Sequence, residues 1–162
     1  MTSSALEHIL QKHHRDAYLW ARQCCSFDDD QAKDVLQAVY LKILEGKAKF
    51  NEKSSAKTWL FSVIRYTAID QFKKEKHLEP LDIGLEIPDW TEINREEPMN
   101  YEGLIQQLSP MQAQVLLMVF YHQLTLEESA EVLQISIGTA RTHYDRGKKR
   151  LKQMILKTQE QI

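Results

Sequence analysis

Residues 124–151 read LTLEESAEVLQISIGTARTHYDRGKKRL. Thr125 and Glu128 have the spacing of a capping box, which predicts that a short helix begins here. Residues 134–136 predict a turn of three residues, and Ser136 is placed to cap the longer helix that follows. A short helix, a three-residue turn and a longer helix are the layout of a helix-turn-helix, whose second helix enters the major groove of DNA.

The longer helix, predicted to run to about residue 157, has two chemically different faces. Helical spacing predicts a buried seam of Ala140, Tyr144, Gly147, Leu151 and Ile155. The residues predicted to contact DNA from the other side are Thr139, Arg141, Thr142, Asp145, Arg146 and Lys149. Arginine binds guanine edges through two hydrogen bonds, and threonine bonds a base or a phosphate. The alternative is a solvated basic face on an ordinary helix, against which the caps, the turn length and the small seam residues argue.

The net charge of −2 hides an uneven distribution along the chain. Residues 1–76 hold 13 basic and 10 acidic side chains, whereas residues 77–98 hold one basic and seven acidic ones. Residues 99–162 hold seven basic and six acidic side chains, and all seven basic ones fall within 139–157. Two locally basic regions on either side of an acidic strip are a charge pattern typical of a nucleic-acid binder.

Helical periodicity also predicts helices over about 4–25, 30–45, 56–74 and 110–122, and no segment shows strand-like alternation. The expected helix starts are the acidic cluster 28–30, the pair Ser54-Ser55, and Ser109-Pro110 with Gln112 completing a capping box. The apolar run 115–120 is expected in a buried core. Prolines and scattered acids in 77–98 predict a linker. We therefore predict an all-α protein of two small helical domains, 1–76 and 99–162, joined by a flexible acidic linker.

Several function classes lack support in the sequence. No apolar run approaches the roughly 20 residues that span a bilayer, and the first eight residues do not form a secretory signal. The two cysteines are the neighbours Cys24 and Cys25, expected to be reduced thiols. There is no Gly-rich phosphate loop, metal-spaced cluster or nucleophile motif. We expect a cytoplasmic protein that does not insert into membranes, is not an enzyme and needs no cofactor or metal.

Two sets of motifs, in order along the chain, resemble the bacterial extracytoplasmic-function (ECF) sigma factors of the sigma-70 family. The second half contributes 108–117 (LSPMQAQVLL) and 124–151, which alone are also similar to a response-regulator helix-turn-helix. The first half decides between the two, with 34–37 (DVLQ), 50–61 (FNEKSSAKTWLF), 64–70 (IRYTAID) and 72–74 (FKK). The resemblance covers nearly the whole chain outside the linker.

The resemblance implies that 1–76 binds the clamp of RNA polymerase core and opens the promoter −10 element, while 99–162 reads the duplex −35 element and touches the polymerase flap. On the helix 30–45, Leu41 suits an interface, with a scattered surface leucine as the alternative. The predicted polymerase-binding residues are Asp34, Gln37, Ala38 and Leu41. Many members of the family are held inactive by an anti-sigma factor, and the sequence does not identify one here.

Strand opening requires a pocket for an extruded base and a cationic surface for the freed strand. Residues 47–76 hold eight basic and three acidic side chains, interleaved with aromatic ones, and the loop 51–55 is small and polar. Trp59 is expected in the core, and Asp70 is expected to pair with Lys74. The residues predicted to bind the single-stranded −10 element are Asn51, Lys53, Ser54, Lys57, Phe61, Ser62, Arg65 and Tyr66, the last four on an exposed helix face.

The acidic linker has two interpretations. The resemblance implies that it threads the RNA path of the polymerase, and its 22 residues extend to roughly 70 Å, about the separation of two promoter elements. The alternative is a disordered acidic spacer. The chain departs from the family pattern at Ala38 (usually Glu), Tyr66 (Asn) and Gln134 (Gly), and Asp145 either accepts from cytosine or repels phosphate.

Two other functions compete with the sigma-factor hypothesis. A stand-alone helix-turn-helix regulator would bind duplex operator DNA tightly by itself, usually as a dimer on a palindrome. A sigma factor would instead bind duplex weakly when free and direct initiation once mixed with core polymerase. An enzyme is the third hypothesis, and the missing catalytic motifs argue against it.

Overall fold

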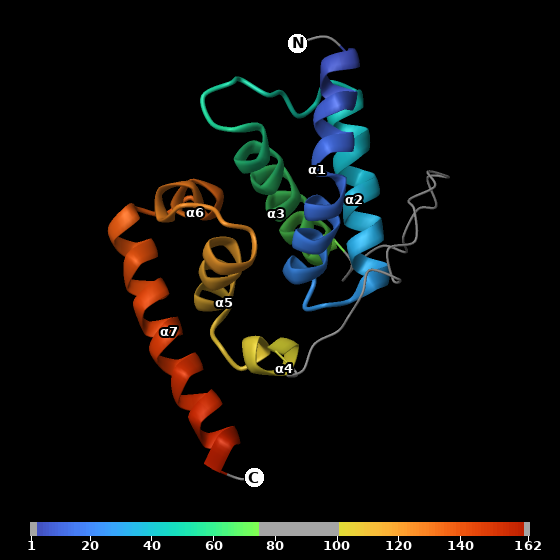
Figure 1. Ribbon diagram of the computed structural model, residues 1–162. Coiled ribbons are helices and arrows are strands. Elements are labelled where there is room, and N and C mark those ends of the chain that lie inside the picture. Colours follow the sequence, from blue (N-terminus) through green and yellow to red (C-terminus); the bar gives the residue numbers. More distant parts are fainter. Residues whose placement is uncertain (1–2, 75–100, 161–162) are drawn as a thin grey trace. The chain divides into compact units, whose positions relative to one another are not determined.

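Every regular element within residues 3–74 and 101–160, the residues that this computed structural model describes, is a helix (Figure 1). The first part contains α1 (Ser3–Cys24), α2 (Asp29–Leu44) and α3 (Ala56–Lys74). The second contains α4 (Tyr101–Gln106), α5 (Pro110–Leu116), the π-helical turn η1 (Leu117–Tyr121), α6 (Leu126–Leu133) and α7 (Ile137–Glu160). The all-α prediction is confirmed. Periodicity did not predict α4, because six residues are too few to show a period.

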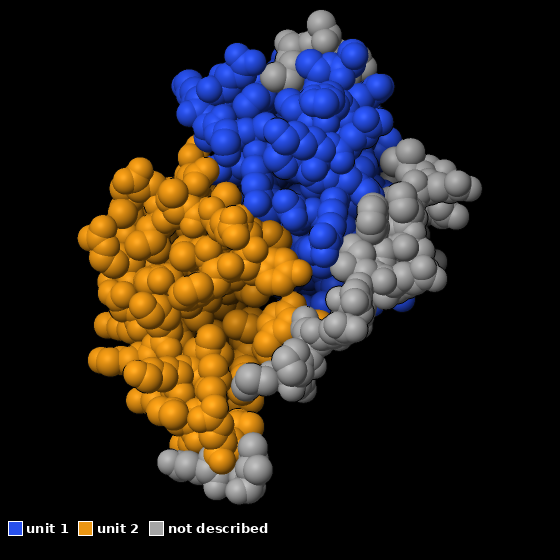
Figure 2. Space-filling model, in the orientation of Figure 1, with its two compact units in different colours: residues 1–94 blue, residues 95–162 orange. Residues whose placement is uncertain are grey.

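The chain forms two compact units, unit 1 of residues 1–94 and unit 2 of residues 95–162, coloured separately in Figure 2. Helices α1 to α3 belong to unit 1, and α4 to α7 belong to unit 2. The predicted linker, 77–98, lies outside the described residues.

The core of unit 1 is built around two stacked aromatic rings. Trp20 of α1 and Phe61 of α3 are both fully buried, with ring centroids 5.2 Å apart and planes within 3°. The Trp20 indole Nε1 donates to the Phe61 carbonyl oxygen at 3.1 Å. Because the indole N–H is satisfied, the ring can be buried without a desolvation penalty for that group. The predicted stripe of α2 completes this core with the buried residues Ala32, Val35, Leu36, Val39 and Ile43.

The corner between α1 and α2 is held by acidic side chains. Asp28 caps α2 by accepting from the Gln31 backbone N–H, as the acidic cluster predicted. One oxygen of Asp29 accepts from the Tyr18 hydroxyl at 2.9 Å and from Arg22 Nε at 2.8 Å. Periodicity alone gave no sign of this contact, because it joins residues from two helices.

The apolar run 115–120 is not one continuous α-helix. The His122 backbone N–H donates to the Leu117 carbonyl five residues earlier, at 3.0 Å, which is the bonding pattern of a π-helix. The wider turn displaces the following side chains around the helix axis. Met118 is fully buried as predicted, but the prediction is wrong for Phe120, which is 61% exposed.

The start of α5 confirms one half of the predicted capping box. Ser109 Oγ accepts from the Gln112 backbone N–H at 3.3 Å, and Pro110 occupies the first helical position. The other half is wrong, because the buried Oε1 of Gln112 has no hydrogen-bond partner. The Gln112 side chain lies at the contact between α5 and α7, against Gly147, which directs it away from the helix start.

The helix-turn-helix forms as predicted, from α6, residues 134–136 and α7. Thr125 Oγ1 accepts from the Glu128 N–H and Glu128 Oε1 accepts from the Thr125 N–H, both at 3.0 Å, so this capping box is complete. Ser136 Oγ accepts from the Thr139 N–H at 3.1 Å and caps α7. Each helix therefore begins where its cap predicted.

Gln134 ends α6 in the left-handed conformation, with φ 57° and ψ 45°. Side chains with a Cβ are disfavoured there, whereas glycine adopts this conformation freely. We expect Gln134→Gly to stabilise unit 2 by about 0.5–1 kcal/mol, measured by thermal unfolding of the full chain. Gln134→Ala, which keeps the Cβ, is the matched control and should give no such gain. Equal stability of the two variants would contradict the assignment of strain to this position.

Candidate nucleic-acid interface

The packing of α7 confirms that its small residues form a buried seam. Ala140 is fully buried, and Gly147 lies directly against α5. The larger residues of the predicted seam, Tyr144, Leu151 and Ile155, are only half-buried. A Cβ at Gly147 would lie 3.1 Å from Leu116 Cδ1 and 3.2 Å from Gln112 Cβ, so α7 can approach α5 this closely only with glycine here. The seam fixes how α7 is rotated and therefore which side chains face solvent.

The opposite face of α7 presents a cationic surface. The guanidinium groups of Arg141 and Arg146 are exposed, and two threonine hydroxyls bond locally. Thr142 Oγ1 donates to the Gly138 carbonyl at 3.1 Å, and Thr139 Oγ1 accepts from Ser136 Oγ at 2.8 Å. Every residue of the predicted duplex-binding set is exposed, namely Thr139, Arg141, Thr142, Asp145, Arg146 and Lys149. Contact with DNA by this set stays a prediction.

The loop before α3 has a defined local conformation. Asn51 Oδ1 accepts from the Lys53 N–H at 3.1 Å, and Glu52 between them has φ 61°. Ser55 Oγ accepts from the Thr58 N–H at 3.1 Å, which confirms Ser55 as the cap of α3. Asn51 and Lys53 are exposed, so this turn presents an amide and an ammonium group to solvent.

The predicted exposure of Phe61 is wrong. Phe61 is fully buried against Trp20, because Leu60, Phe61 and Ile64 all fall on the wide apolar stripe that α3 turns towards the core. The same geometry places Trp59 only half-buried, tilted against Phe50 with centroids 5.1 Å apart, and not in the core as expected.

The remaining predicted residues of α3 are accessible to different extents. Tyr66 is 66% exposed, whereas Ser62 and Arg65 are half-buried, with Ser62 Oγ donating to the Thr58 carbonyl at 3.0 Å. Lys57 is half-buried and lies 3.6 Å from the Asp16 carboxylate. The predicted pair of Asp70 and Lys74 is confirmed at 3.3 Å.

Lys42 of α2 joins this surface, although the sequence did not indicate it. Its Nζ lies 5.6 Å from the centre of the Tyr66 ring and donates to Thr67 Oγ1 at 3.2 Å. A cation held beside an exposed ring is the combination that binds stacked bases and phosphates. The contact crosses from α2 to α3, so only the fold reveals it.

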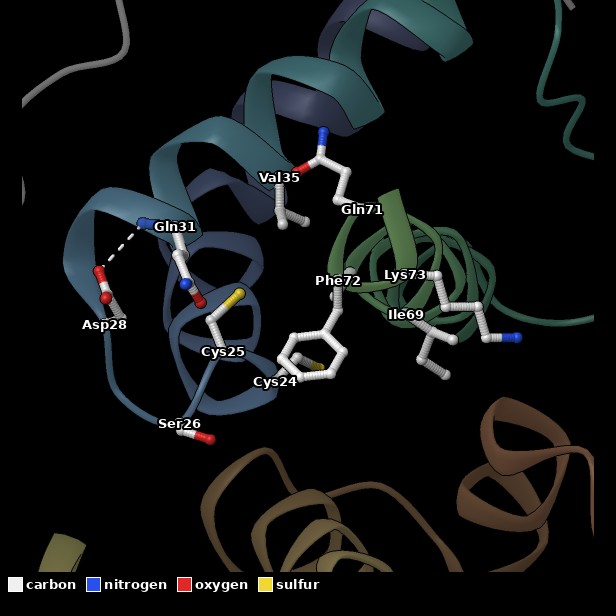
Figure 3. Close-up of a pocket in the computed structure, with 11 residues that line it drawn as sticks. Cys24, Cys25, Ser26, Asp28, Gln31, Val35, Ile69, Gln71, Phe72 and Lys73 are labelled. Atoms are coloured by element: carbon white, nitrogen blue, oxygen red, sulfur yellow. Dashed lines mark hydrogen bonds between the residues drawn. The ribbon is translucent and has the colours of Figure 1, made fainter. Parts of the chain in front are cut away.

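A largely apolar cavity of about 540 Å³ lies at the far end of α3 (Figure 3). Phe72 and Ile69 line it and are 65% and 38% exposed. Cys24 and Cys25 line it too, and neither forms a disulfide. Burial, and next the neighbouring Cys25, raise the pKa of the Cys24 thiol well above its ordinary value. Cys24 therefore stays protonated near neutral pH and is a poor nucleophile.

The predicted polymerase-binding face of α2 is less exposed than expected. Asp34, Gln37, Ala38 and Leu41 are all half-buried, so Leu41 is not a freely exposed leucine. On the neighbouring face, Tyr40 is also half-buried, with its hydroxyl 2.5 Å from Nδ1 of His14 in α1. Burial lowers the pKa of His14, which favours a neutral ring in this bond.

Unit 2 carries an apolar groove of about 280 Å³ that the sequence did not predict. Ile105 of α4, Leu117 and Phe120 of η1, and Leu151 and Ile155 of α7 are among its lining residues. The π-helical turn creates one side of this groove by directing Phe120 and Tyr121 outwards. The groove is therefore a candidate interaction site.

Within the described residues, 3–74 and 101–160, no three His, Cys, Asp or Glu side chains are grouped so that they could hold a metal ion. None of the helices in this part of the chain is both long enough and apolar enough to cross a bilayer.

Comparison with known proteins places both units in one family. The family model described as "Sigma-70 region 2" matches residues 9–78, and "Sigma-70, region 4" matches residues 99–151. The chain is 26% identical to the ECF RNA polymerase sigma factor SigX of Bacillus subtilis (strain 168), covering 95% of this chain and 85% of the relative. It is 28% identical to the RNA polymerase sigma factor YlaC of the same organism, covering 82% of each.

Solved structures share the fold. The sigma factor RpoE, solved in complex with the anti-sigma factor NepR from Bartonella quintana, gives a TM-score of 0.74 at 19% identity, covering 93% of this chain and 96% of that one. CnrH, solved in complex with the cytosolic domain of CnrY, gives 0.68 at 13% identity, covering 95% and 89%. Two family models in the order of the two units, and relatives that match along most of their length, show that this chain belongs to the sigma-70 family as an ECF sigma factor.

Proposed function

We propose that this ECF sigma factor acts in the cytoplasm as a non-catalytic specificity subunit that directs RNA polymerase core to promoters at two points. In this proposal residues 1–76 bind core and open the −10 element, residues 77–98 are the linker, and residues 99–162 read the −35 element. The observation that carries the proposal is that unit 2 has a cationic recognition face on α7, while unit 1 has an exposed aromatic ring on α3 beside a cation of α2. A stand-alone regulator would have no need of the second surface.

At the −35 element, Arg141 and Thr142 lie in the first turns of α7, the part of a recognition helix that enters the major groove. We propose that Arg141 reads base edges, with Arg146 and Lys149 contributing charge further along. Asp145 is the one acidic group on this face and would favour cytosine by accepting from its N4 amino group. The whole proposed set is Thr139, Arg141, Thr142, Asp145, Arg146 and Lys149.

At the −10 element, we propose that the turn at Asn51 and the ring of Tyr66 bind separated bases. Stacking contributes about 1–3 kcal/mol per base, enough to offset unpairing costs of a few kcal/mol. Lys42 strengthens this proposal, because it sets a positive charge beside the exposed ring. Phe61 is excluded because it is buried. The proposed −10 contacts are Asn51, Lys53, Ser54, Lys57, Ser62, Arg65, Tyr66 and Lys42.

For polymerase binding, we propose that the α2 face formed by Asp34, Gln37, Ala38 and Leu41 contacts the clamp, and that the groove of unit 2 accepts the flap. The groove offers apolar side chains for a helix or loop to cover. RpoE was solved in complex with an anti-sigma factor, and CnrH in complex with the cytosolic domain of CnrY. We therefore also propose an anti-sigma partner for this chain.

Asp34→Ala tests the clamp contact directly. We expect core affinity to fall by about fivefold to tenfold, because a charged group at a protein interface contributes roughly 1 kcal/mol or more. The measurement is competition between labelled wild-type protein and the variant for core polymerase. Asp30→Ala, which removes an exposed acid from the first turn of the same helix, is the matched control and should bind core normally.

Promoter preference distinguishes a role of Asp34 in core binding from a role in DNA contact. Once enough Asp34→Ala protein is added to saturate core, the selected promoter sequences should be those of the wild type. Unchanged core affinity, or changed promoter preference at saturation, would contradict the placement of Asp34 at the clamp.

A further inference from the structure

The π-helical turn brings Phe120 to the side of the recognition helix. In η1 the chain makes an i to i+5 bond, and the side chains beyond it are displaced around the axis. The Phe120 ring then stacks on Tyr144 of α7, with centroids 5.8 Å apart and planes within 20°. A continuous α-helix through 115–120 would have directed this side chain elsewhere.

A cation completes the stack. Lys148 of α7 lies with its Nζ 4.9 Å from the centre of the Tyr144 ring. The three side chains form a ladder in the order Phe120, Tyr144, Lys148, which runs from the apolar groove to the edge of the basic face. We call this the Tyr144 ladder.

The position of Lys148 aligns it with the DNA-facing residues. Lys148 lies seven positions after Arg141, which is close to two helical turns, so the two lie on one line about 10 Å apart along the axis. When the first turns of α7 lie in the major groove, a cation two turns further along the helix lies close to the phosphate backbone.

We propose that Phe120 and Tyr144 are positioning residues that hold the Lys148 ammonium as a fixed phosphate contact beside the −35 element. The inference rests on the proposed reading of the −35 element by α7. A lysine side chain has four rotatable bonds, and ordering them opposes binding. The ring orders them in advance while leaving the charge exposed, so that the phosphate meets a cation already in place.

The test uses holoenzyme reconstituted from core polymerase and full-length variants. The probe is the promoter duplex that the wild-type holoenzyme enriches most from a random library, and its affinity is measured across a range of salt concentrations. Lys148→Gln should reduce the slope of log K against log salt by about 0.9, the loss of one phosphate contact. Tyr144→Leu should lower affinity by about twofold to fivefold, the size of an exposed cation–π contact. Tyr144→Phe keeps the aromatic face and should match the wild type.

The double variant decides whether Tyr144 acts through Lys148. Tyr144→Leu combined with Lys148→Gln should bind no more weakly than Lys148→Gln alone, because the ring has no cation left to hold. Additive losses, or Tyr144→Phe as weak as Tyr144→Leu, would overturn the proposal. Lys157→Gln, an exposed lysine near the end of α7, is the matched control and should leave the salt slope unchanged.

Two further variants distinguish failure of the ladder proposal from failure of the proposed −35 contact. Arg141→Ala tests the underlying function, and normal base preference in that variant would refute the proposed −35 contact itself. If Arg141→Ala does change base preference while the ladder variants do not change affinity, only the ladder proposal fails. Should Tyr144→Leu not fold, Phe120→Leu takes its place, because Phe120 stacks on Tyr144 and is itself 61% exposed. It should lower affinity in the wild-type background and not in the Lys148→Gln background, and an equal loss in both would overturn the proposal.

Discussion

Replacing Phe61 by alanine is expected to lower the free energy of unfolding of unit 1 by about 3–5 kcal/mol. The ring is fully buried and stacked on Trp20, so its removal leaves a cavity at the centre of three helices. Small domains have only about 5–15 kcal/mol of stability in total, and the variant should therefore be largely destabilised. The measurement is chemical denaturation of the full chain followed by tryptophan fluorescence, because Trp20 and Trp59 lie in α1 and α3 of unit 1.

Tyr66→Ala is the matched control for Phe61→Ala. Both substitutions truncate an aromatic ring on α3, but Tyr66 is 66% exposed and should change stability by no more than about 0.5 kcal/mol. Tyr66→Ala should instead impair promoter opening. A Phe61→Ala protein with wild-type stability and a specific defect in strand opening would show that Phe61 contacts DNA, which its burial contradicts.

Arg141→Ala is expected to relax base preference at one position of the −35 element by about 1–3 kcal/mol, which is roughly 5-fold to 150-fold in discrimination. The guanidinium is exposed near the start of α7, where a recognition helix meets base edges. The measurement is selection of promoters by the variant holoenzyme from duplexes randomised in the −35 region, compared with selection by the wild type.

Arg150→Ala is the matched control for Arg141→Ala. It removes an exposed arginine from the same helix, but nine residues further on, where the side chain suits phosphates and not bases. This variant should weaken binding to all duplexes by about the same factor and leave the order of their affinities unchanged. If both variants changed the order of duplex affinities equally, or if neither changed it, the assignment of base reading to Arg141 would be contradicted.

The helix-turn-helix was predictable because its signals are local. Thr125 with Glu128, and Ser136 before α7, satisfy backbone groups within three residues, and these caps begin helices whatever the rest of the chain does. The seam at Ala140 and Gly147 was equally readable, since only small side chains allow α7 to lie so close to α5.

The errors concern residues whose environment depends on other elements. Leu60, Phe61 and Ile64 fit a wide apolar stripe, so a broader stripe would have placed Phe61 in the core. Phe120 could not have been placed, because no local signal announces a π-helical turn. Lys42 was missed because its contact with Tyr66 joins two helices. Periodicity predicts which face of a helix is apolar, but not which neighbour that face meets.

Run-off transcription measures whether this protein directs RNA polymerase to promoters at two points. Purified protein is mixed with bacterial core polymerase and a library of promoter fragments, and duplex binding by the protein alone is measured in parallel. We expect transcripts from a defined subset of promoters only when both proteins are present, and weak duplex binding by the protein alone. Tight, specific duplex binding by the isolated protein, with no initiation in the presence of core, would contradict it.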